Sequence, residues 1–211
     1  MTKIIRGNPY ATKNKDIDRI FDFLGISKKD IFCDLGSGKG KIVFHSSKKI
    51  KFSYGIENYR KYIRYSKARK KKQKTSNMKF IEGNYEKRQI LNKVSNSTIV
   101  YCINDVSLSF LKLFEEIFES ETFFVTFGYP PYPILPQTFI DDTFYVMKTP
   151  FKLAKNPEKW ARSILGKNST MKDVYKQIKK DNKPKYANEM IEDLKELIIS
   201  THWLVKKYRN S

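Results

Sequence analysis

Apolar positions in the first two thirds of the chain alternate between helical and strand spacing. Ile17, Ile20, Phe21 and Leu24 recur at intervals of three and four residues, which predicts an amphipathic helix ending at Gly25. Strands are predicted over residues 31–34, 52–57, 78–82, 98–103 and 122–127, with helices over 40–49, 59–72 and 106–118 between them. This rhythm indicates right-handed βαβ units and a parallel sheet with helices on both faces, which is an α/β fold.

The pattern changes toward the carboxyl end. Two apolar runs, residues 134–140 and 143–147, flank a pair of aspartates and are expected to form an antiparallel hairpin that closes the sheet. Helical spacing then takes over, and helices are predicted over residues 160–165, 171–180 and 187–208. We therefore expect residues 1–150 to form the main domain and residues 151–211 to form a small, basic helical extension.

A glycine-rich loop follows the first predicted strand. Residues 34–40 read Asp-Leu-Gly-Ser-Gly-Lys-Gly, and glycine lets the backbone turn with positive φ close beneath a ligand. A phosphate-binding P-loop would need Ser or Thr where this chain has Ile42. A dinucleotide loop has another glycine spacing, and the carboxylate of Asp34 would repel its phosphates. The charge favours a cationic ligand without phosphate, and S-adenosylmethionine meets that requirement.

A second carboxylate supports the same interpretation. Glu57 ends the second predicted strand, one helix-plus-strand unit beyond the loop, where an acid can accept hydrogen bonds from ribose hydroxyls. The alternative for Asp34 is a turn carboxylate that caps the following helix. The spacing to Glu57 favours a ligand-binding role for both acids.

The motif D-L-G-S-G-K-G, followed by G-I-E at residues 55–57, resembles the first two motifs of class I S-adenosylmethionine-dependent methyltransferases. With a later strand ending in I-N at 103–104, the chain is similar to non-SET lysine methyltransferases of the disruptor-of-telomeric-silencing type and their small archaeal relatives. The resemblance covers about residues 5–150. It implies a Rossmann-like seven-stranded methyltransferase sheet, mostly parallel with a closing antiparallel hairpin, and S-adenosyl-L-methionine as cofactor.

The resemblance assigns further residues to the cofactor. Asn104 matches an asparagine that closes over the cofactor, Tyr10 matches a tyrosine that reaches it, and Asn84 stands where a residue near the adenine is usual. The expected cofactor-binding set is Tyr10, Asp34, Gly36, Ser37, Gly38, Glu57, Asn84 and Asn104.

The expected substrate-side residues are Asn104, Asp105, Tyr129 and Tyr132. Methyl transfer from a sulfonium requires chiefly the alignment of donor, methyl group and nucleophile. Asp105 is expected either to hold the incoming amine or to N-cap the helix after it. Tyr129 and Tyr132 belong to the proline-rich loop 128–133 and are expected either to line the substrate entrance or simply to pack.

Composition indicates which partners and which cellular compartment to expect. The formal net charge is +20, which suits a polyanionic partner, and residues 60–74 carry much of the excess. Nucleic-acid contact and a merely solvated helix face are both compatible with this run. The two cysteines fall in predicted core strands, the two histidines are far apart, and no apolar stretch is long enough for a membrane span. We expect a soluble, cytoplasmic protein without a metal site.

Three functions remain open from the sequence. The first is an S-adenosylmethionine-dependent N-methyltransferase of protein lysine, which the resemblance implies, acting on a protein that is either free or associated with nucleic acid. The second is an RNA or DNA methyltransferase that binds nucleic acid through residues 60–74 and the C-terminal helices. The third is a non-catalytic nucleic-acid-binding protein on the same scaffold, which the retained acids Asp34 and Glu57 disfavour.

Overall fold

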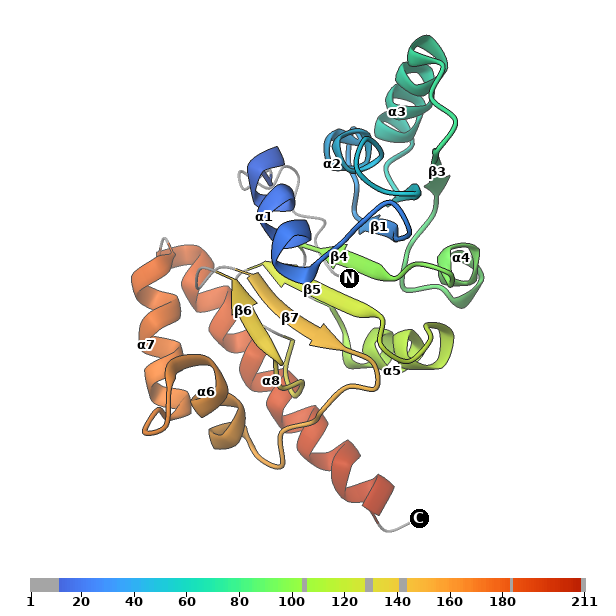
Figure 1. The fold of residues 1–211 in the computed structure, drawn as a ribbon. Coiled ribbons are helices and arrows are strands. Elements are labelled where there is room, and N and C mark those ends of the chain that lie inside the picture. The colour runs from blue at the N-terminus through green and yellow to red at the C-terminus, as the bar shows by residue number, and fades with distance from the viewer. Residues whose placement is uncertain (1–11, 104–105, 128–130, 141–143, 183, 210–211) are drawn as a thin grey trace.

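A single seven-stranded sheet organises the molecule. The computed structural model describes residues 12–103, 106–127, 131–140, 144–182 and 184–209, and its strand order is β3-β2-β1-β4-β5-β7-β6 (Figure 1). The strands are β1 (Ile31–Leu35), β2 (Phe52–Glu57), β3 (Met78–Glu82), β4 (Ile99–Cys102), β5 (Phe123–Phe127), β6 (Thr138–Ile140) and β7 (Phe144–Lys148). The first five are parallel, and β7 runs antiparallel to both β5 and β6. The predicted α/β sheet with its closing hairpin is confirmed.

Helices connect the strands and follow the last one. They are α1 (Asn14–Leu24), α2 (Lys41–Ser46), α3 (Arg60–Gln73), α4 (Arg88–Leu91), α5 (Leu108–Ile117), α6 (Pro157–Leu165), α7 (Met171–Asp181) and α8 (Pro184–Arg209), with a short 3₁₀ turn at Asn92–Val94. Helix α1 ends as predicted, because Gly25 adopts the left-handed conformation at φ +66° and closes the last turn. The sequence pattern missed α4, which is only one turn long and shows no helical period.

The sheet separates two apolar layers. On one face Cys33, Leu35 and Cys102 pack with Phe110 and Phe114 of α5. On the other face Phe32 and Tyr101 pack with Ile17, Ile20 and Phe21 of α1. Both faces are covered, which explains why the central strands read as nearly continuous apolar runs. Both cysteines are buried free thiols, as the sequence predicted.

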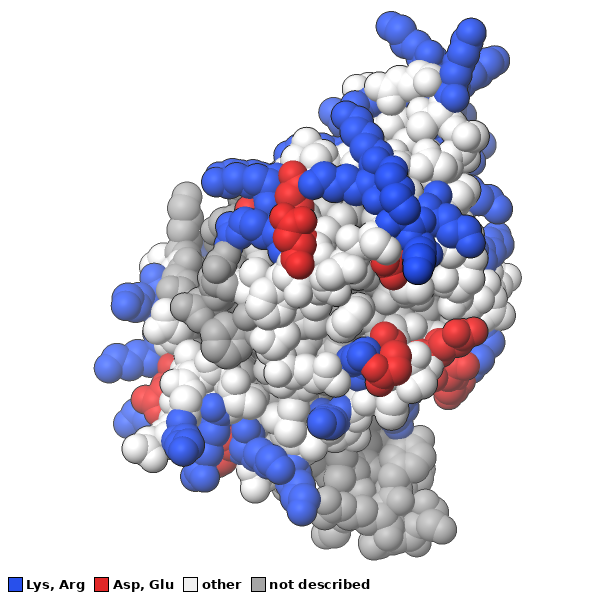
Figure 2. Space-filling model, in the orientation of Figure 1, with Lys and Arg blue, Asp and Glu red and all other residues white. Residues whose placement is uncertain are grey.

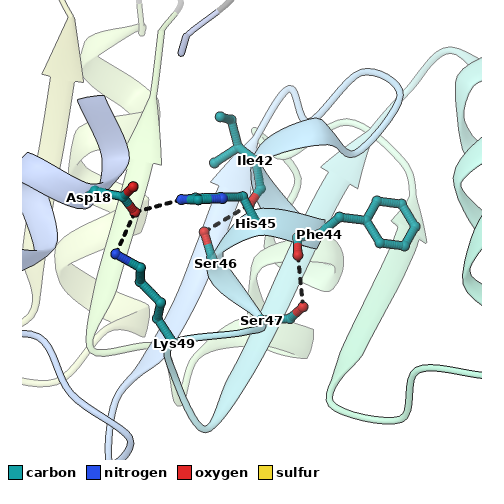
Figure 3. A network of polar contacts seen from close by, with 7 residues as sticks. All are labelled: Asp18, Ile42, Phe44, His45, Ser46, Ser47 and Lys49. Atoms are coloured by element: carbon teal, nitrogen blue, oxygen red, sulfur yellow. Dashed lines mark hydrogen bonds and ion pairs between the residues drawn. The ribbon is translucent and has the colours of Figure 1, made fainter. Parts of the chain in front are cut away.

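A polar network joins α1 to α2 (Figure 3). Asp18 Oδ1 lies 2.5 Å from His45 Nε2 and 2.8 Å from Lys49 Nζ. Partial burial favours the neutral acid, but the hydrogen bonds to Lys49 and His45 outweigh it and lower the pKa of Asp18. Since α2 follows the glycine-rich loop directly, this network holds the helix after the loop against α1.

The C-terminal helices have an apolar core of their own. Trp160 and Ala161 of α6, Val174 and Ile178 of α7, and Ala187 of α8 are buried together. Figure 1 shows these three helices beside the β6–β7 hairpin rather than over the strands that carry the glycine-rich loop. In the described part of the chain, no helix has the length and apolar character that a bilayer span requires. The same residues contain no cluster of three or more potential metal-binding side chains.

Candidate cofactor site at the carboxyl ends of β1 and β2

The glycine-rich loop is tied to the neighbouring strand through its backbone. The N–H groups of Gly36 and Ser37 both donate to the Ile56 carbonyl at 2.9 Å. Gly40 has a φ of +74°, and an added Cβ there would lie 2.6 Å from the Phe80 ring. Gly55 passes directly beneath the loop, where an added Cβ would lie 2.7 Å from Ser37 Oγ. The glycines are therefore required by close backbone approach and by left-handed geometry.

Glu57 fixes the shape of this loop. Its Oε2 accepts from the Gly38 N–H at 2.9 Å, and its Oε1 accepts from the Tyr59 N–H at 2.7 Å. One carboxylate thus joins the glycine-rich loop to the start of α3. Each oxygen keeps a second lone pair, so the predicted hydrogen bonds to ribose hydroxyls are sterically compatible with this role.

Asp34 lies under the loop and is almost fully enclosed. Only 4% of its surface is exposed, and within the described residues no hydrogen bond or ion pair satisfies its carboxylate. Burial, with a further contribution from the nearby charge of Glu57, raises the pKa of Asp34 to about 7. A buried carboxylate of this kind is stabilised in its charged form by a cation, such as the ammonium of an amino-acid moiety.

A second polar group beneath the loop, beside Asp34, also lacks a hydrogen-bond partner among the described residues. Ser37 Oγ is buried and makes no hydrogen bond with the part of the chain that the structure describes. A hydroxyl and a carboxylate, both buried without partners among the described residues and both beneath a glycine-rich turn, fit a small polar ligand that supplies the missing contacts. These residues fit S-adenosylmethionine, whose ammonium and ribose complement Asp34 and Glu57.

Asn84 and Tyr85 follow β3 at the same edge of the sheet. Asn84 Oδ1 accepts from the Glu86 N–H at 2.9 Å and so shapes its own loop. The Tyr85 ring packs edge-on against Phe110, with the centroids 5.5 Å apart. The structure brings Asp34, Gly36, Ser37, Gly38, Glu57 and Asn84 to one edge, because the parallel strands end there together.

The other predicted site residues lie outside the described residues or inside a core. Tyr10, Asn104, Asp105 and Tyr129 belong to the first group. The alternative that Asp105 caps the next helix is wrong, because α5 begins at Leu108 and its N-cap is Ser107, whose side chain accepts from the Phe110 N–H.

Tyr132 is buried and only 3% exposed. Its ring packs edge-on against Trp160 at 5.6 Å between centroids. Its role at the substrate entrance stays a prediction, and this packing favours the alternative of a structural residue.

Two features near the glycine-rich loop are not predicted by the sequence pattern. Lys39 Nζ, within the glycine-rich loop, lies 5.7 Å from the ring centroids of both Tyr62 and Tyr65 on α3. Thr12 is anchored beside the sheet by a 2.7 Å hydrogen bond between its hydroxyl and that of Tyr101, and by Lys41 Nζ, which donates to its carbonyl. The tyrosine spacing along α3 was the available signal for the first feature. No local signal exists for a contact across 89 residues.

Comparisons with known proteins agree with the fold. A family described as "Methyltransferase domain" matches residues 26–129. The structure of an RNA methyltransferase from Salinibacter ruber, in complex with S-adenosyl-L-homocysteine, is similar over 69% of this chain and 97% of that chain, with 20% identity and a TM-score of 0.57. No curated protein matches the chain.

Two further solved structures are similar at lower TM-scores. The C-terminal domain of precorrin-6Y C5,15-methyltransferase from Rhodobacter capsulatus has 15% identity over 58% of this chain and 66% of its own, with a TM-score of 0.49. An rRNA methylase from Streptococcus thermophilus has 13% identity over 55% of this chain and 70% of its own, with a TM-score of 0.42.

The sheet order, the glycine-rich loop and the two acids define the class I methyltransferase fold. Residues 26–129 match a methyltransferase domain, and S-adenosyl-L-methionine is the methyl donor that this match and the fold support. None of these matches supports the disruptor-of-telomeric-silencing type of lysine methyltransferase specifically.

Proposed function

We propose that this methyltransferase modifies RNA, and that α3 and the glycine-rich loop bind the RNA beside the donor site. The main support is the charge of α3. The helix contains no carboxylate, and its cations are Arg60, Lys61, Arg64, Lys67, Arg69, Lys70, Lys71 and Lys72. Figure 2 shows Lys and Arg side chains gathered around the end of the molecule that α3 forms in Figure 1.

Few of these cations are neutralised within the protein. Among the described residues, Arg60 is the member of the helix paired with a carboxylate, Glu82, at 3.8 Å between exposed side chains. Lys70 Nζ donates to the Met78 carbonyl, and the Arg69 guanidinium lies 4.1 Å from the Phe44 ring centroid. The remaining cations of α3 face solvent and would attract phosphates.

Aromatic side chains accompany the charge. Tyr59 and Tyr65 are 54% and 51% exposed, and Tyr62 lies between them on the helix. Exposed tyrosine rings interleaved with cations are the arrangement on which unpaired bases stack. Tyr59 follows the loop acid Glu57 by two residues, so this surface begins next to the donor site. The Salinibacter ruber neighbour is an RNA methyltransferase, which is consistent with the proposal.

The chemistry required from this chain is mainly positioning. Bound S-adenosylmethionine supplies an electrophilic methyl group, and a nitrogen of the substrate forms the new N–C bond while the S–C bond breaks. Asp34, Glu57 and the loop backbone would orient the donor, and α3 would hold the RNA. The amine loses a proton to solvent or to an acceptor at the substrate side, for which Asp105 stays the sequence-based candidate.

Protein lysine is the second candidate, favoured by the I-N motif at residues 103–104 and by the resemblance to lysine methyltransferases that this motif supports. Electrostatics argues against a basic peptide substrate, because a helix rich in cations and without carboxylates beside the donor site repels a cationic segment. This repulsion would not act on an acidic protein or on a protein bound to RNA.

Labelling distinguishes the two substrates. Purified protein and donor with a radiolabelled methyl group would be incubated with cell extract, and the products divided between protease and nuclease. We expect label that survives protease and is lost with ribonuclease. Label that survives ribonuclease and is lost with protease would replace RNA with a protein substrate. Asp34→Asn, which removes the buried charge, is the inactive control.

A charge reversal on α3 tests the surface itself. We expect Arg64→Glu together with Lys67→Glu to raise the KM for RNA by about tenfold and to leave donor binding unchanged. An unchanged KM for RNA would contradict the placement of the substrate on α3.

A further inference from the structure

A basic groove lies beside α6. It has a volume of about 810 Å³ and is lined by Leu135, Pro136, Gln137, Lys152, Lys159, Arg162, Ser163 and Lys167. Four of the eight lining residues are cations and none is a carboxylate. Within the described residues no ion pair neutralises these four side chains, all of which are exposed. The groove therefore presents unpaired positive charge to solvent.

The sequence of α6 produces this arrangement. Lys159, Arg162 and Ser163 recur at intervals of three and four residues and so share one helix face. Trp160 and Ala161 lie on the buried side, against α7 and α8. Asn156 fixes the start of the helix, since its Oδ1 accepts from the Lys159 N–H at 2.8 Å.

The floor of the groove comes from two segments that are hydrogen-bonded to one another. The Leu135 N–H donates to the Lys152 carbonyl at 2.7 Å, and Ile134 forms an antiparallel bridge with Leu153. The Gln137 N–H donates to the Val146 carbonyl of β7 at 2.8 Å. Leu135 and Pro136 thus provide a fixed, partly apolar part of the groove lining beside the four cations.

The groove and the candidate donor site lie at opposite ends of the parallel strands. Leu135, Pro136 and Gln137 precede β6, which runs parallel to β1. Lys152 follows β7, whose last residue, Lys148, pairs with Phe123 at the start of β5. Both segments are therefore at the amino ends of the parallel strands, whereas Asp34 and Glu57 are near the carboxyl ends. A ligand in the groove cannot be the group that receives the methyl.

We propose that this groove binds the phosphodiester backbone of the RNA substrate at a second contact, remote from methyl transfer. The proposal rests on RNA being the substrate. Four cations without a carboxylate suit a chain of phosphates, and Gln137 and Ser163 supply polar groups for sugar or phosphate oxygens. Leu135 and Pro136 give an unpaired base an apolar surface. The cations of α3 and those of the groove then make two separate contacts with the RNA.

The test uses the full chain and a fluorescein-labelled single-stranded RNA. Lys159→Glu with Arg162→Glu reverses two groove cations. Lys172→Glu with Lys176→Glu makes the same charge change at two exposed positions of α7 and is the matched control. Binding is followed by fluorescence anisotropy over a series of salt concentrations, and circular dichroism verifies that each variant is folded.

We expect the groove variant to bind RNA about tenfold more weakly and the α7 variant to bind nearly as wild type. Each lost phosphate contact reduces the slope of log affinity against log salt by about 0.7 for a single strand, so the groove variant should lose about 1.4. Equal losses in the two variants would mean that only net charge matters, and this result would overturn the proposal. An unchanged groove variant would also overturn it.

Two further measurements identify the partner and separate the groove from the catalytic function. Poly-glutamate that competes as strongly as RNA, and loses its affinity in the groove variant, would identify an acidic protein as the partner and overturn the RNA assignment. Donor-dependent labelling of RNA with all variants distinguishes the two proposals. Groove-dependent RNA binding without RNA methylation would reject the proposed function, and the groove would then bind RNA that is not a substrate. RNA methylation with full affinity in the groove variant would reject the groove alone.

Discussion

At the scale of single residues, the candidate donor site contains one buried carboxylate that no cation in the described part of the chain compensates. Asp34 is buried near Glu57, and its raised pKa means that the fold favours the neutral acid. The ammonium of a donor bound beside Asp34 would reverse this preference. Folding therefore favours the neutral form of Asp34, whereas donor binding would favour its charged form. Such perturbed carboxylates are common in binding sites.

Asp34→Asn should separate these demands. Because the pKa of Asp34 is higher in the folded protein than in the unfolded chain, its stability contribution is complete below about pH 4 and is lost as pH rises to about 7. We expect the variant to be more stable than wild type at pH 8, by up to about 4 kcal/mol, and to bind the donor poorly. Urea unfolding and calorimetry measure the two effects. A variant less stable than wild type at pH 8 would contradict this assignment.

Gly55→Ala should damage the site without changing any polar group. The added Cβ would lie 2.7 Å from Ser37 Oγ and 2.8 Å from Val43 Cγ2, so the loop or the strand must move. We expect a loss of about 1–3 kcal/mol in the free energy of unfolding and weaker donor binding. Thermal unfolding and calorimetry test this, and wild-type values in both would show that the loop is less constrained than its contacts indicate.

At the scale of elements, helix ends were harder to predict than helix existence. The apolar pattern located α1, α3 and α5, and β2 and β3 have the predicted bounds. The start of α5 was wrong by two residues, because Ser107 rather than Asp105 is its N-cap. Both residue types cap helices well, and only the geometry of the entering chain selects one of them.

The assignment of Ser107 as the N-cap of α5 can be tested by substitution. Ser107→Ala should lower the free energy of unfolding by about 1 kcal/mol, because the Phe110 N–H loses its acceptor. Asp105→Ala, the comparison variant, should have little effect on stability. Any loss of methyl transfer in Asp105→Ala would then report a chemical role for that residue. Chemical denaturation of both variants checks the assignment, and a larger stability loss in Asp105→Ala would contradict it.

At the scale of the whole molecule, the charge at the candidate donor site differs in sign from the charge of the proposed RNA-binding surfaces. The candidate donor site contains a buried carboxylate, whereas α3 and the groove beside α6 carry exposed cations that contribute to the formal net charge of +20. Surface charges are screened by salt, but a buried contact is screened much less. If RNA is the substrate as proposed, binding of RNA and binding of the donor should therefore depend differently on salt.

We expect log affinity for single-stranded RNA to fall linearly with log salt, with a slope of about 0.7 per phosphate contacted. Donor affinity should change little over the same range. Anisotropy with labelled RNA and calorimetry with the donor provide the comparison. RNA affinity that does not depend on salt would show that the basic surfaces of α3 and α6 do not carry binding.

The sequence by itself determined the βαβ rhythm, the glycine-rich loop and the two acids, because apolar periodicity and glycine spacing are local properties of the chain. Tertiary structure alone decided which polar groups lack partners among the described residues, as at Asp34 and Ser37, and which distant residues meet, as at Thr12 and Tyr101. It also created the groove beside α6 from three separate segments. Burial and long-range contact depend on how the layers pack, and no local pattern encodes them.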